Sequence, residues 1–272
     1  MDSIGLLDSG VGGLSVLRHV QTLLPQENLI YVADQAHVPY GPRPAVEVQA
    51  FSRAITRFLL AQGAKLIVVA CNTASAAALT DLRQTFPDVP FVGMEPAVKM
   101  GAAATRSGKV GVMATAGTFK SQRYANLMQR FAQNVQLYLD PCRGLVELIE
   151  AGQTDDAATA ALLQKLLSPM LAAGIDTLIL GCTHYPFVLP LLQTLVGPDV
   201  TIIDPAPAVA RQVERVLQSH SALNPIGSSG IIQAYTTGDV ELFASLAQRL
   251  LQTPLPTASL HWTASGQLSL ND

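Results

Sequence analysis

The sequence is poor in charged and aromatic side chains. Of its 272 residues, 14% are charged and 6% are aromatic, with a single tryptophan; the net charge is −3 at pH 7 and the pI is near 5.9. A nucleic-acid-binding surface needs clustered Lys and Arg, so this composition argues against a nucleic-acid partner. Hydrophobic residues make up 49% and the mean hydropathy is +0.31. The chain can therefore bury a large core, in one large domain or two ordinary ones.

Long hydrophobic runs are also missing. The apolar stretches are about as long as buried strands and are broken by Gly, Pro or charge, so none predicts a transmembrane helix. The N-terminal sequence MDSIGLLDSG lacks the basic region and long apolar core of a signal peptide. We therefore expect a cytoplasmic protein without a membrane partner. Its three cysteines are expected to be reduced, with no structural disulfide.

Nucleotide-binding motifs are absent as well. Asp8 and Ser9 precede glycines at 10, 12 and 13, but the third glycine position of a dinucleotide fingerprint is Ser15, and no GxxxxGK[ST] occurs. The glycines would let backbone N–H groups approach a small anion at a helix N-terminus. A simple strand-to-helix turn capped by Asp8 fits the motif equally well.

What the sequence does contain is an alternation of short β-branched runs and amphipathic stretches. Helical periodicity is clear over residues 46–60 and 209–218. The runs between such stretches are continuously apolar, as in strands covered on both faces. The pattern predicts an α/β fold with mainly parallel sheets. The predicted strands are Ile4–Leu7, Leu29–Ala33, Leu66–Ala70, Phe91–Met94, Val110–Met113, Val135–Leu139, Leu178–Leu180, Val200–Ile203 and Ile231–Tyr235.

A weak internal repeat suggests two similar halves. LIVVACNTA and LILGCTHYP are both apolar runs that stop at a cysteine and continue with polar residues. Because ligands of open α/β sheets bind beyond the carboxyl ends of strands, two facing halves would bring both thiols to one cleft. Boundaries near Glu95–Pro96 and Asp204–Pro207 predict a discontinuous first domain, residues 1–96 plus 207–272, and a second domain, 97–206. The chain beyond about Pro256 is expected to be weakly structured.

Cys71 and Cys182 are the leading candidates for chemistry. A buried cysteine is commonly a small hydrophobe, but two in matching contexts favour a functional role. A helix N-terminus after each thiol would lower its pKa toward neutral. Cys142 lacks the following polar pair. A zinc site that adds His184 has no CxxC or HxxxH spacing, so no metal is expected.

Other polar residues surround these candidates. The stiff loop of residues 34–43, DQAHVPYGPR, can close over a ligand or simply pack on the surface. Thr115 and Thr118 predict an N-cap and first turn that could also hold a carboxylate. Glu150 ends a helical stretch and could reach His184 through the fold, or be an ordinary surface residue. No lysine stands in a recognisable pyridoxal-phosphate context, so no cofactor is expected.

At this point the ordered set of motifs resembles a known family. DSGVGGLSV, PYG, ACNTASA, EPAV, TAGTFKSQRY, LVELIEAG and LGCTHYP together are similar to glutamate racemase, of the cofactor-independent amino-acid racemase superfamily, from Ile4 to about Gln218. The resemblance implies interconversion of L- and D-glutamate, which supplies D-glutamate for peptidoglycan. It also implies two pseudo-symmetric α/β domains with the substrate in the cleft between them, a homodimer, and neither cofactor nor metal.

The resemblance also implies roles for individual residues. Cys71 and Cys182 would be the catalytic acid/bases, with Cys71 acting on D-glutamate and Cys182 on L-glutamate. Asp8 would assist Cys71, while Glu150 and His184 would assist Cys182. The substrate would be bound by Asp8, Ser9, Tyr40, Gly41, Asn72, Thr73, Thr183 and His184, with Pro39, Thr115 and Thr118 as further candidates.

The chemistry agrees with this interpretation, and three alternatives stay open. Inversion at Cα needs a base on one face and an acid on the other, and thiols can serve as both near neutral pH. Another superfamily racemase, such as an aspartate racemase, would share both thiols, although PYG and TAGT favour glutamate. A Cys–His hydrolase or amide transferase would need only one cysteine. A non-catalytic binding protein would need neither.

Overall fold

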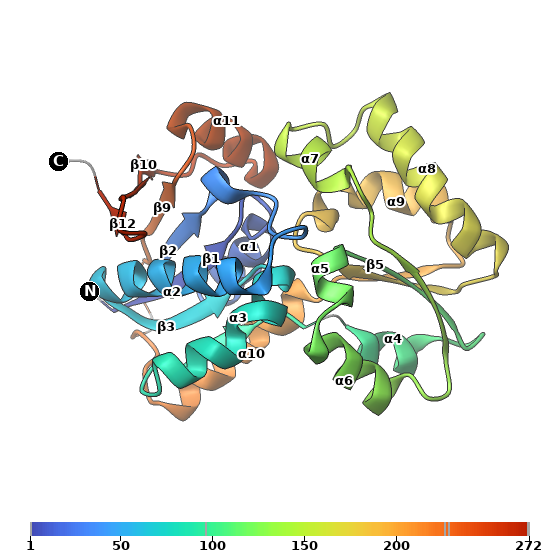
Figure 1. Ribbon diagram of the computed structural model, residues 1–272, viewed down its shortest axis with the longest axis horizontal. Helices are drawn as coiled ribbons and strands as arrows, with labels where there is room; N and C mark the ends of the chain where they lie inside the picture. The colour runs from blue at the N-terminus through green and yellow to red at the C-terminus, as the bar shows by residue number, and fades with distance from the viewer. Residues whose placement is uncertain (1, 96, 226, 228, 271–272) are drawn as a thin grey trace.

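Two parallel sheets form the framework of the protein. The computed structural model describes residues 2–95, 97–225, 227 and 229–270 (Figure 1). Over these residues the first sheet has six strands in the order β10-β9-β2-β1-β3-β4. All its pairings are parallel. Its strands are β1 Ser3–Asp8, β2 Asn28–Ala33, β3 Ala64–Val69, β4 Phe91–Gly93, β9 Ile232–Thr236 and β10 Thr257–Ser259.

The second sheet repeats part of the first. Within the described residues it has four parallel strands in the order β6-β5-β7-β8. The order β2-β1-β3-β4 of the first sheet therefore recurs, and β3 and β7, which precede the two cysteines, hold equivalent places. This agrees with the internal repeat predicted from the sequence. The strands are β5 Lys109–Ala114, β6 Gln136–Asp140, β7 Thr177–Gly181 and β8 Thr201–Ile203.

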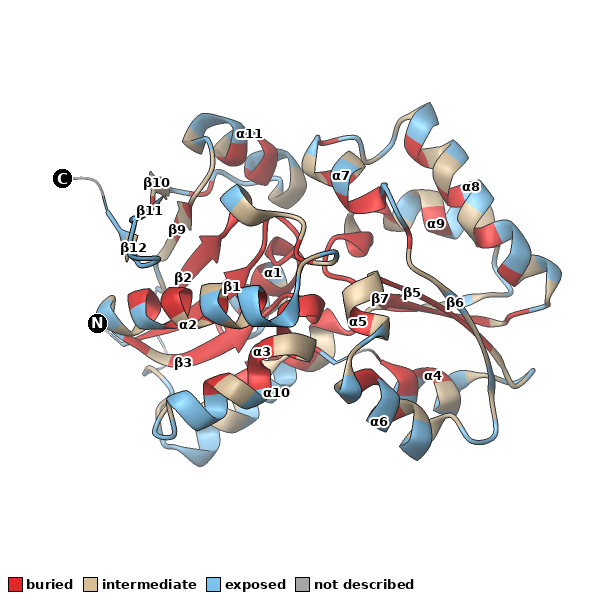
Figure 2. Cartoon of the chain, in the orientation of Figure 1, coloured by how far each residue is buried: buried red, intermediate tan, exposed pale blue. Residues whose placement is uncertain are grey.

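Helices cover both sheets. Every residue of β1 and β7 is buried, which explains why their sequences are continuously apolar. Figure 2 shows buried strands at the centre of each half and exposed outer helix faces. The first half has α1 Leu14–Leu23, η1 Gln35–His37, α2 Ala45–Ala61, α3 Asn72–Thr85, α10 Ala206–Ser219 and α11 Val240–Leu251. The second has α4 Val98–Ala104, α5 Ala116–Phe119, α6 Gln122–Phe131, α7 Leu145–Glu150, α8 Ala157–Ala172, η2 Tyr185–Val188 and α9 Leu189–Val196.

All nine predicted strands are confirmed, but the prediction for the C-terminal segment is wrong. Beyond Pro256 the chain adds β10 to the first sheet and then forms an antiparallel hairpin of β11, His261–Trp262, and β12, Leu268–Ser269. Leu260 is fully buried. These partners are distant in sequence, so local periodicity could not predict them. Of the predicted domain limits, Pro96 and the terminal residues 1 and 271–272 lie outside the described residues.

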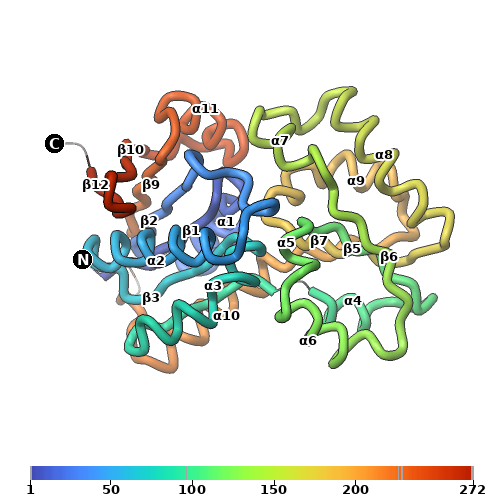
Figure 3. The backbone as a smooth tube through the Cα atoms, in the orientation of Figure 1, coloured from blue at the N-terminus to red at the C-terminus, as the bar shows by residue number. Residues whose placement is uncertain are grey.

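The carboxyl ends of the strands of the two sheets meet. Asp8 ends β1, and Cys71, Thr115 and Cys182 closely follow β3, β5 and β7. Across the junction the Thr183 hydroxyl donates to Asp8 Oδ2 at 3.2 Å. In Figure 3 the loop after β2 reaches from the first half toward α5 of the second. Among the described residues, no helix combines the length and apolar character needed to span a membrane.

Candidate active site

Cys71 begins helix α3 and is almost completely buried. Its Sγ accepts a hydrogen bond from Ala74 N at 3.4 Å and lies 3.8 Å from the Ser9 hydroxyl. Burial first, and then the negative charge of Asp8, raise the pKa of the Cys71 thiol to about 12. The expectation of a lowered pKa is therefore wrong for this residue. Loss of water disfavours the thiolate more than the single helix N–H favours it.

Cys182 has a different environment. Its Sγ lies 3.6 Å from His184 Nδ1, and His184 Nε2 is 2.6 Å from Glu150 Oε1. Burial alone would lower the pKa of His184, but its hydrogen bonds with Cys182 and Glu150 hold that pKa well above the usual range. Burial would likewise raise the pKa of Glu150, yet the hydrogen bond with His184 contributes most to lowering it. The pair is therefore an imidazolium and a carboxylate, and the imidazolium faces the Cys182 sulfur.

The two thiols belong to one electrostatic site. Besides burial and Asp8, the charge of Cys182 also raises the pKa of Cys71. Burial and a negative charge thus favour the protonated form of the Cys71 thiol, whereas the Cys182 sulfur lies beside the His184 imidazole. This is the asymmetry that an acid and a base acting together require.

Asp8 lies between the two halves, fully buried. Its Oδ1 accepts from Gly10 N at 2.9 Å and its Oδ2 from Thr183 Oγ1 at 3.2 Å. Burial raises the pKa of the Asp8 carboxyl to about 6, and the positive charge of His184 opposes that rise. The Ser9 hydroxyl, rather than the Asp8 carboxylate, is the polar neighbour of the Cys71 sulfur. Asp8 acts on this thiol through its charge.

The polar residue after Cys71 has an unsatisfied side chain. Asn72 is 2% exposed, and within the described residues neither its Nδ2 nor its Oδ1 meets a hydrogen-bond partner. A buried amide without partners costs about 1–3 kcal/mol, so such groups are normally satisfied or serve a ligand. One donor and one acceptor at the start of α3 would suit a ligand that carries both a carboxylate and an ammonium group.

A row of threonine hydroxyls crosses from one half to the other. Thr73 Oγ1 is 2.8 Å from Thr115 Oγ1, which is 3.1 Å from Thr118 Oγ1. Thr115 also caps α5 by accepting from Thr118 N, as the sequence predicts. The structure thus brings these three candidates together.

The loop with Pro39, Tyr40 and Gly41 borders this row. The Tyr40 ring is buried and its hydroxyl donates to Asp34 Oδ2 at 2.6 Å, so that hydroxyl is engaged inside the protein. Gly41 approaches the second half so closely that a Cβ there would lie 3.1 Å from Thr115 Cβ. The loop is therefore part of the junction, and it presents backbone rather than the tyrosine hydroxyl.

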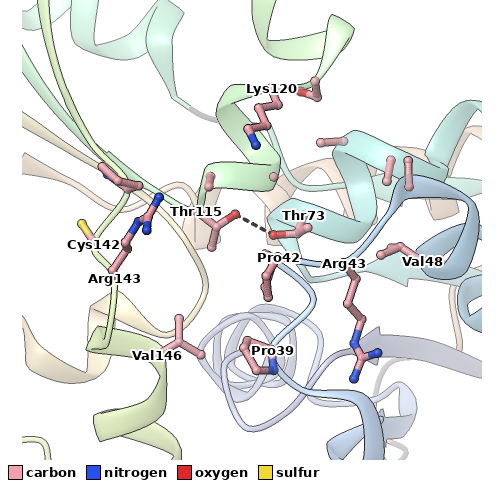
Figure 4. Close-up of a pocket in the computed structure, with 18 of the residues that line it drawn as sticks. Pro39, Pro42, Arg43, Val48, Thr73, Thr115, Lys120, Cys142, Arg143 and Val146 are labelled. Atoms are coloured by element: carbon pink, nitrogen blue, oxygen red, sulfur yellow. Dashed lines mark hydrogen bonds between the residues drawn. The ribbon is translucent and has the colours of Figure 1, made fainter.

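A cavity of about 910 Å³ opens between the two halves of the molecule (Figure 4). Both halves line it, with Thr73 and Arg43 from the first and Thr115, Lys120 and Arg143 from the second. Neither Cys71 nor Cys182 is among the lining residues, but Thr73 and Tyr185, which follow them by two and three residues, are. We call this cavity, lined by both halves, the mouth of the candidate site.

Several groups of this site are not predictable from the local sequence. The backbone N–H of Val11 donates to Glu150 Oε1 at 2.8 Å, and the Gln35 amide donates to Glu150 Oε2 at 3.2 Å. The Asp34 carboxylate accepts hydrogen bonds from Tyr40, Thr237 and the Trp262 indole, and it lies 2.9 Å from His37 Nδ1. The only sequence signal was the position of Asp34 and Gln35 directly after a predicted strand.

Cys71, Cys182 and His184 are the residues that a metal site at this position would use. Within the part of the chain that the structure describes, no three His, Cys, Asp or Glu side chains form a group that could hold a metal ion. The nearest partners of the two sulfurs are instead N–H, hydroxyl and imidazole groups. The donor set suits proton transfer.

A comparison with known protein families gives the class of protein to which this fold belongs. The profile described as Asp/Glu/Hydantoin racemase matches residues 4–213, which is most of the chain. The chain therefore belongs to the Asp/Glu/hydantoin racemase family, and it is an amino-acid racemase.

Similar proteins narrow the activity further. A glutamate racemase from Pseudomonas paraeruginosa is 58% identical over 220 residues, which cover 81% of this chain and 83% of that protein. The structure of a glutamate racemase from Bacillus anthracis matches with a TM-score of 0.87 at 35% identity, covering 95% and 97% of the two chains. The Escherichia coli glutamate racemase, in complex with L-glutamate and the activator UDP-MurNAc-ala, matches with a TM-score of 0.84 at 31% identity over 100% of both chains. These relatives support glutamate racemase activity for the chain.

Proposed function

We propose that the chain interconverts L- and D-glutamate by proton transfer between Cα and two thiols, Cys71 and Cys182. The observation that carries this proposal is a pair of buried sulfurs with different neighbours, the Ser9 hydroxyl for Cys71 and the His184–Glu150 pair for Cys182. The Cys71 thiol is held protonated by burial and by Asp8, while the His184 imidazolium faces the Cys182 sulfur.

The proton balance follows from this arrangement. The Cys182 thiolate takes the Cα proton of one enantiomer, and the Cys71 thiol delivers its own proton to the opposite face. The product leaves with Cys71 as thiolate and Cys182 as thiol, which is the state required for the reverse reaction. By the family resemblance Cys182 acts on L-glutamate and Cys71 on D-glutamate. A single base would mostly return the proton to its original face.

The surrounding polar groups would bind the substrate. The unpartnered Asn72 amide is suited to the substrate's α-carboxylate or ammonium group. The remaining proposed contacts are Asp8, Ser9, Thr73, Thr183 and His184, the backbone of Tyr40 and Gly41, and, at the mouth, Pro39, Thr115 and Thr118. Donors at these positions would also stabilise the negative charge that develops when Cα loses its proton. The complex of the E. coli relative with L-glutamate supports this substrate.

Broader properties are proposed on the resemblance alone. The D-glutamate product would serve peptidoglycan synthesis in the cytoplasm, and the protein would act as a homodimer with residues 1–96 plus 207–272 and 97–206 as its two domains. Light scattering of the purified protein tests the dimer, since a monomeric mass would contradict it.

The mechanism is tested by replacing each thiol separately. Cys71→Ser and Cys182→Ser should each lose most racemisation of glutamate, with unchanged circular dichroism. Cys142→Ser is the matched control, because Cys142 is also buried but contacts neither of the other two sulfurs through a hydrogen bond. Full activity in either of the first two variants would refute the two-thiol mechanism.

Isotope exchange identifies the substrate. Incubation of L-glutamate with the protein in deuterated water should yield D-glutamate that carries deuterium at Cα. Racemisation of aspartate but not glutamate would assign the chain to another activity of the superfamily. Hydrolysis that depends on Cys182 and not on Cys71 would favour a Cys–His hydrolase.

A further inference from the structure

Glu150 is shared between the two halves of the molecule. It ends α7 in the second half, where it pairs with His184. Two of its donors come from the first half: Val11 N reaches Oε1 at 2.8 Å and Gln35 Nε2 reaches Oε2 at 3.2 Å. Oε1 also accepts a hydrogen bond from His184 Nε2, whereas Oε2 is bonded by the Gln35 amide. The carboxylate therefore depends on both halves for its position.

Gln35 is itself held in one orientation. Its Oε1 accepts from Thr236 Oγ1 at 3.0 Å, at the buried end of β9. Thr236 Oγ1 in turn accepts from Gly238 N at 3.1 Å. A carboxylate cannot donate, so the amide nitrogen must face Glu150, and this is the orientation that the Thr236 bond requires. Contacts within the first half thus fix the orientation of the Gln35 amide that Glu150 requires.

A second contact ties the same helix to the first half. The Arg249 guanidinium of α11 donates to the backbone oxygen of Gly152 at 2.5 Å, just beyond the end of α7. Figure 1 shows α11 and α7 side by side at the junction. Docking of α7 on the first half is therefore what brings Glu150 within reach of Gln35.

We propose that Gln35 is a positioning residue for the Cys182 half of the site: it holds Glu150 against His184, and so makes the activation of Cys182 depend on contact between the halves. This inference rests on the proposed two-thiol function. A continuous path of hydrogen bonds runs from Thr236 through Gln35, Glu150 and His184 to the Cys182 sulfur. Gln35 touches none of the reacting atoms.

The charged and titratable groups around Glu150 set the expected pH effect. They are His184, which faces it directly, Asp8 at the end of β1, Tyr31 on β2, Cys182 beyond His184, and Arg249 of α11, which bonds to Gly152 just after α7. Without the Gln35 amide the carboxylate of Glu150 loses a donor that favours its charged form, so its pKa rises. The acid limb of activity should therefore move to higher pH.

Two substitutions of Gln35 test this role. Gln35→Met keeps the length and packing of the side chain but removes the amide. It should move the acid limb of kcat/KM upward by about half to one pH unit, which is a loss of about three- to tenfold below that limb. Gln35→Glu places a carboxylate against Glu150 and should move the limb further in the same direction. The matched control is Gln233→Met, since Gln233 is a half-buried glutamine with two hydrogen bonds on β9, away from the thiols.

Isotope effects locate the defect at one thiol. The two enantiomers of glutamate have equal free energy, so kcat/KM must fall equally in both directions. The primary deuterium isotope effect can differ, because a weakened Cys182 makes its own proton transfer more rate-limiting. In Gln35→Met the effect should rise for one α-deuterated enantiomer and fall for the other, and His184→Asn should select the same enantiomer.

The outcomes separate this inference from the proposed function. If Gln35→Met matches Gln233→Met in pH profile and isotope effects while the wild type racemises and Cys182→Ser does not, Gln35 has no positioning role and the two-thiol function stands. Isotope effects that change equally for both enantiomers would also overturn the inference. If the wild-type protein fails to racemise glutamate, the proposed function itself is wrong.

Discussion

Gly10→Ala, which adds a methyl group beside Glu150, should lower activity much more than stability. A Cβ built on Gly10 would lie 1.9 Å from Glu150 Oε1, whereas ordinary contacts begin near 3.4 Å. The oxygen must therefore withdraw by about 1.5 Å. That oxygen is 2.6 Å from His184 Nε2 and 2.8 Å from Val11 N, so a shift of this size breaks or badly distorts both hydrogen bonds.

The expected magnitude follows from the bonds that are lost. The His184 bond alone, which is the one that leads to Cys182, is worth about 1.5–3 kcal/mol as a hydrogen bond to a charged group, and each 1.36 kcal/mol corresponds to about tenfold in rate. Gly10→Ala should therefore lower kcat/KM for glutamate by about 10- to 100-fold. The fold should tolerate the change better than a clash in the core, because the displaced oxygen is at the far end of a flexible side chain rather than on the backbone.

Gly5→Ala provides the opposite signature. Its Cβ would lie 2.9 Å from Ile67 Cδ1 and 3.1 Å from both Ala64 Cβ and Leu59 Cδ1, within the packed core. Overpacking of this kind costs about 1–3 kcal/mol of stability but leaves the site untouched. Racemisation kinetics and urea unfolding of both variants give the comparison. Gly10→Ala with activity within about twofold of wild type, or with a stability loss larger than that of Gly5→Ala, would refute the reasoning.

Three further substitutions probe the site and its supports. Asp8→Asn should abolish most activity yet stabilise the protein. Burial raises the pKa of Asp8 in the folded state from 3.8 to about 6, so the ionised carboxylate destabilises the fold. Its removal should raise the free energy of unfolding by up to about 3 kcal/mol at pH 8. That gain should fade as pH falls from 6 toward 4, and a pH-independent difference in urea unfolding would contradict it. Trp262→Phe removes the indole donor to Asp34 Oδ1 at 2.7 Å and should lower the free energy of unfolding by about 1–3 kcal/mol. Unfolding monitored by circular dichroism measures this loss, and an unchanged midpoint would show that the hydrogen bond does not stabilise the fold. Thr115→Val breaks the 2.8 Å contact with Thr73 and should raise KM for glutamate about threefold to tenfold, so an unaltered KM in steady-state kinetics would exclude a role at the mouth.

The sequence alone determined the strands and the placement of the two candidate thiols. Strands such as β1 and β7 are buried on both faces, so they need uninterrupted apolar residues, and that requirement is visible in the sequence. Cys71 and Cys182 could be assigned to the carboxyl ends of their strands because the apolar runs stop just before them. The caps of α5 and α8, Thr115 and Asp156, were predictable for the same local reason.

Tertiary structure decided which groups act on each thiol. The partners of Glu150 on the first half, Val11 and Gln35, lie 139 and 115 residues away in sequence, and no local pattern relates them. The pKa of Cys71 rises where the helix start alone predicted a fall, because burial and the charge of Asp8 act on it only in the folded first sheet, where β1 and β3 are neighbours. The C-terminal strands escaped prediction because pairing with β9 and the bond from Trp262 to Asp34 stabilise them. Local sequence determines where a strand ends and which residue follows it, whereas long-range contacts determine the burial, the neighbouring charges and therefore the pKa of the groups around each thiol.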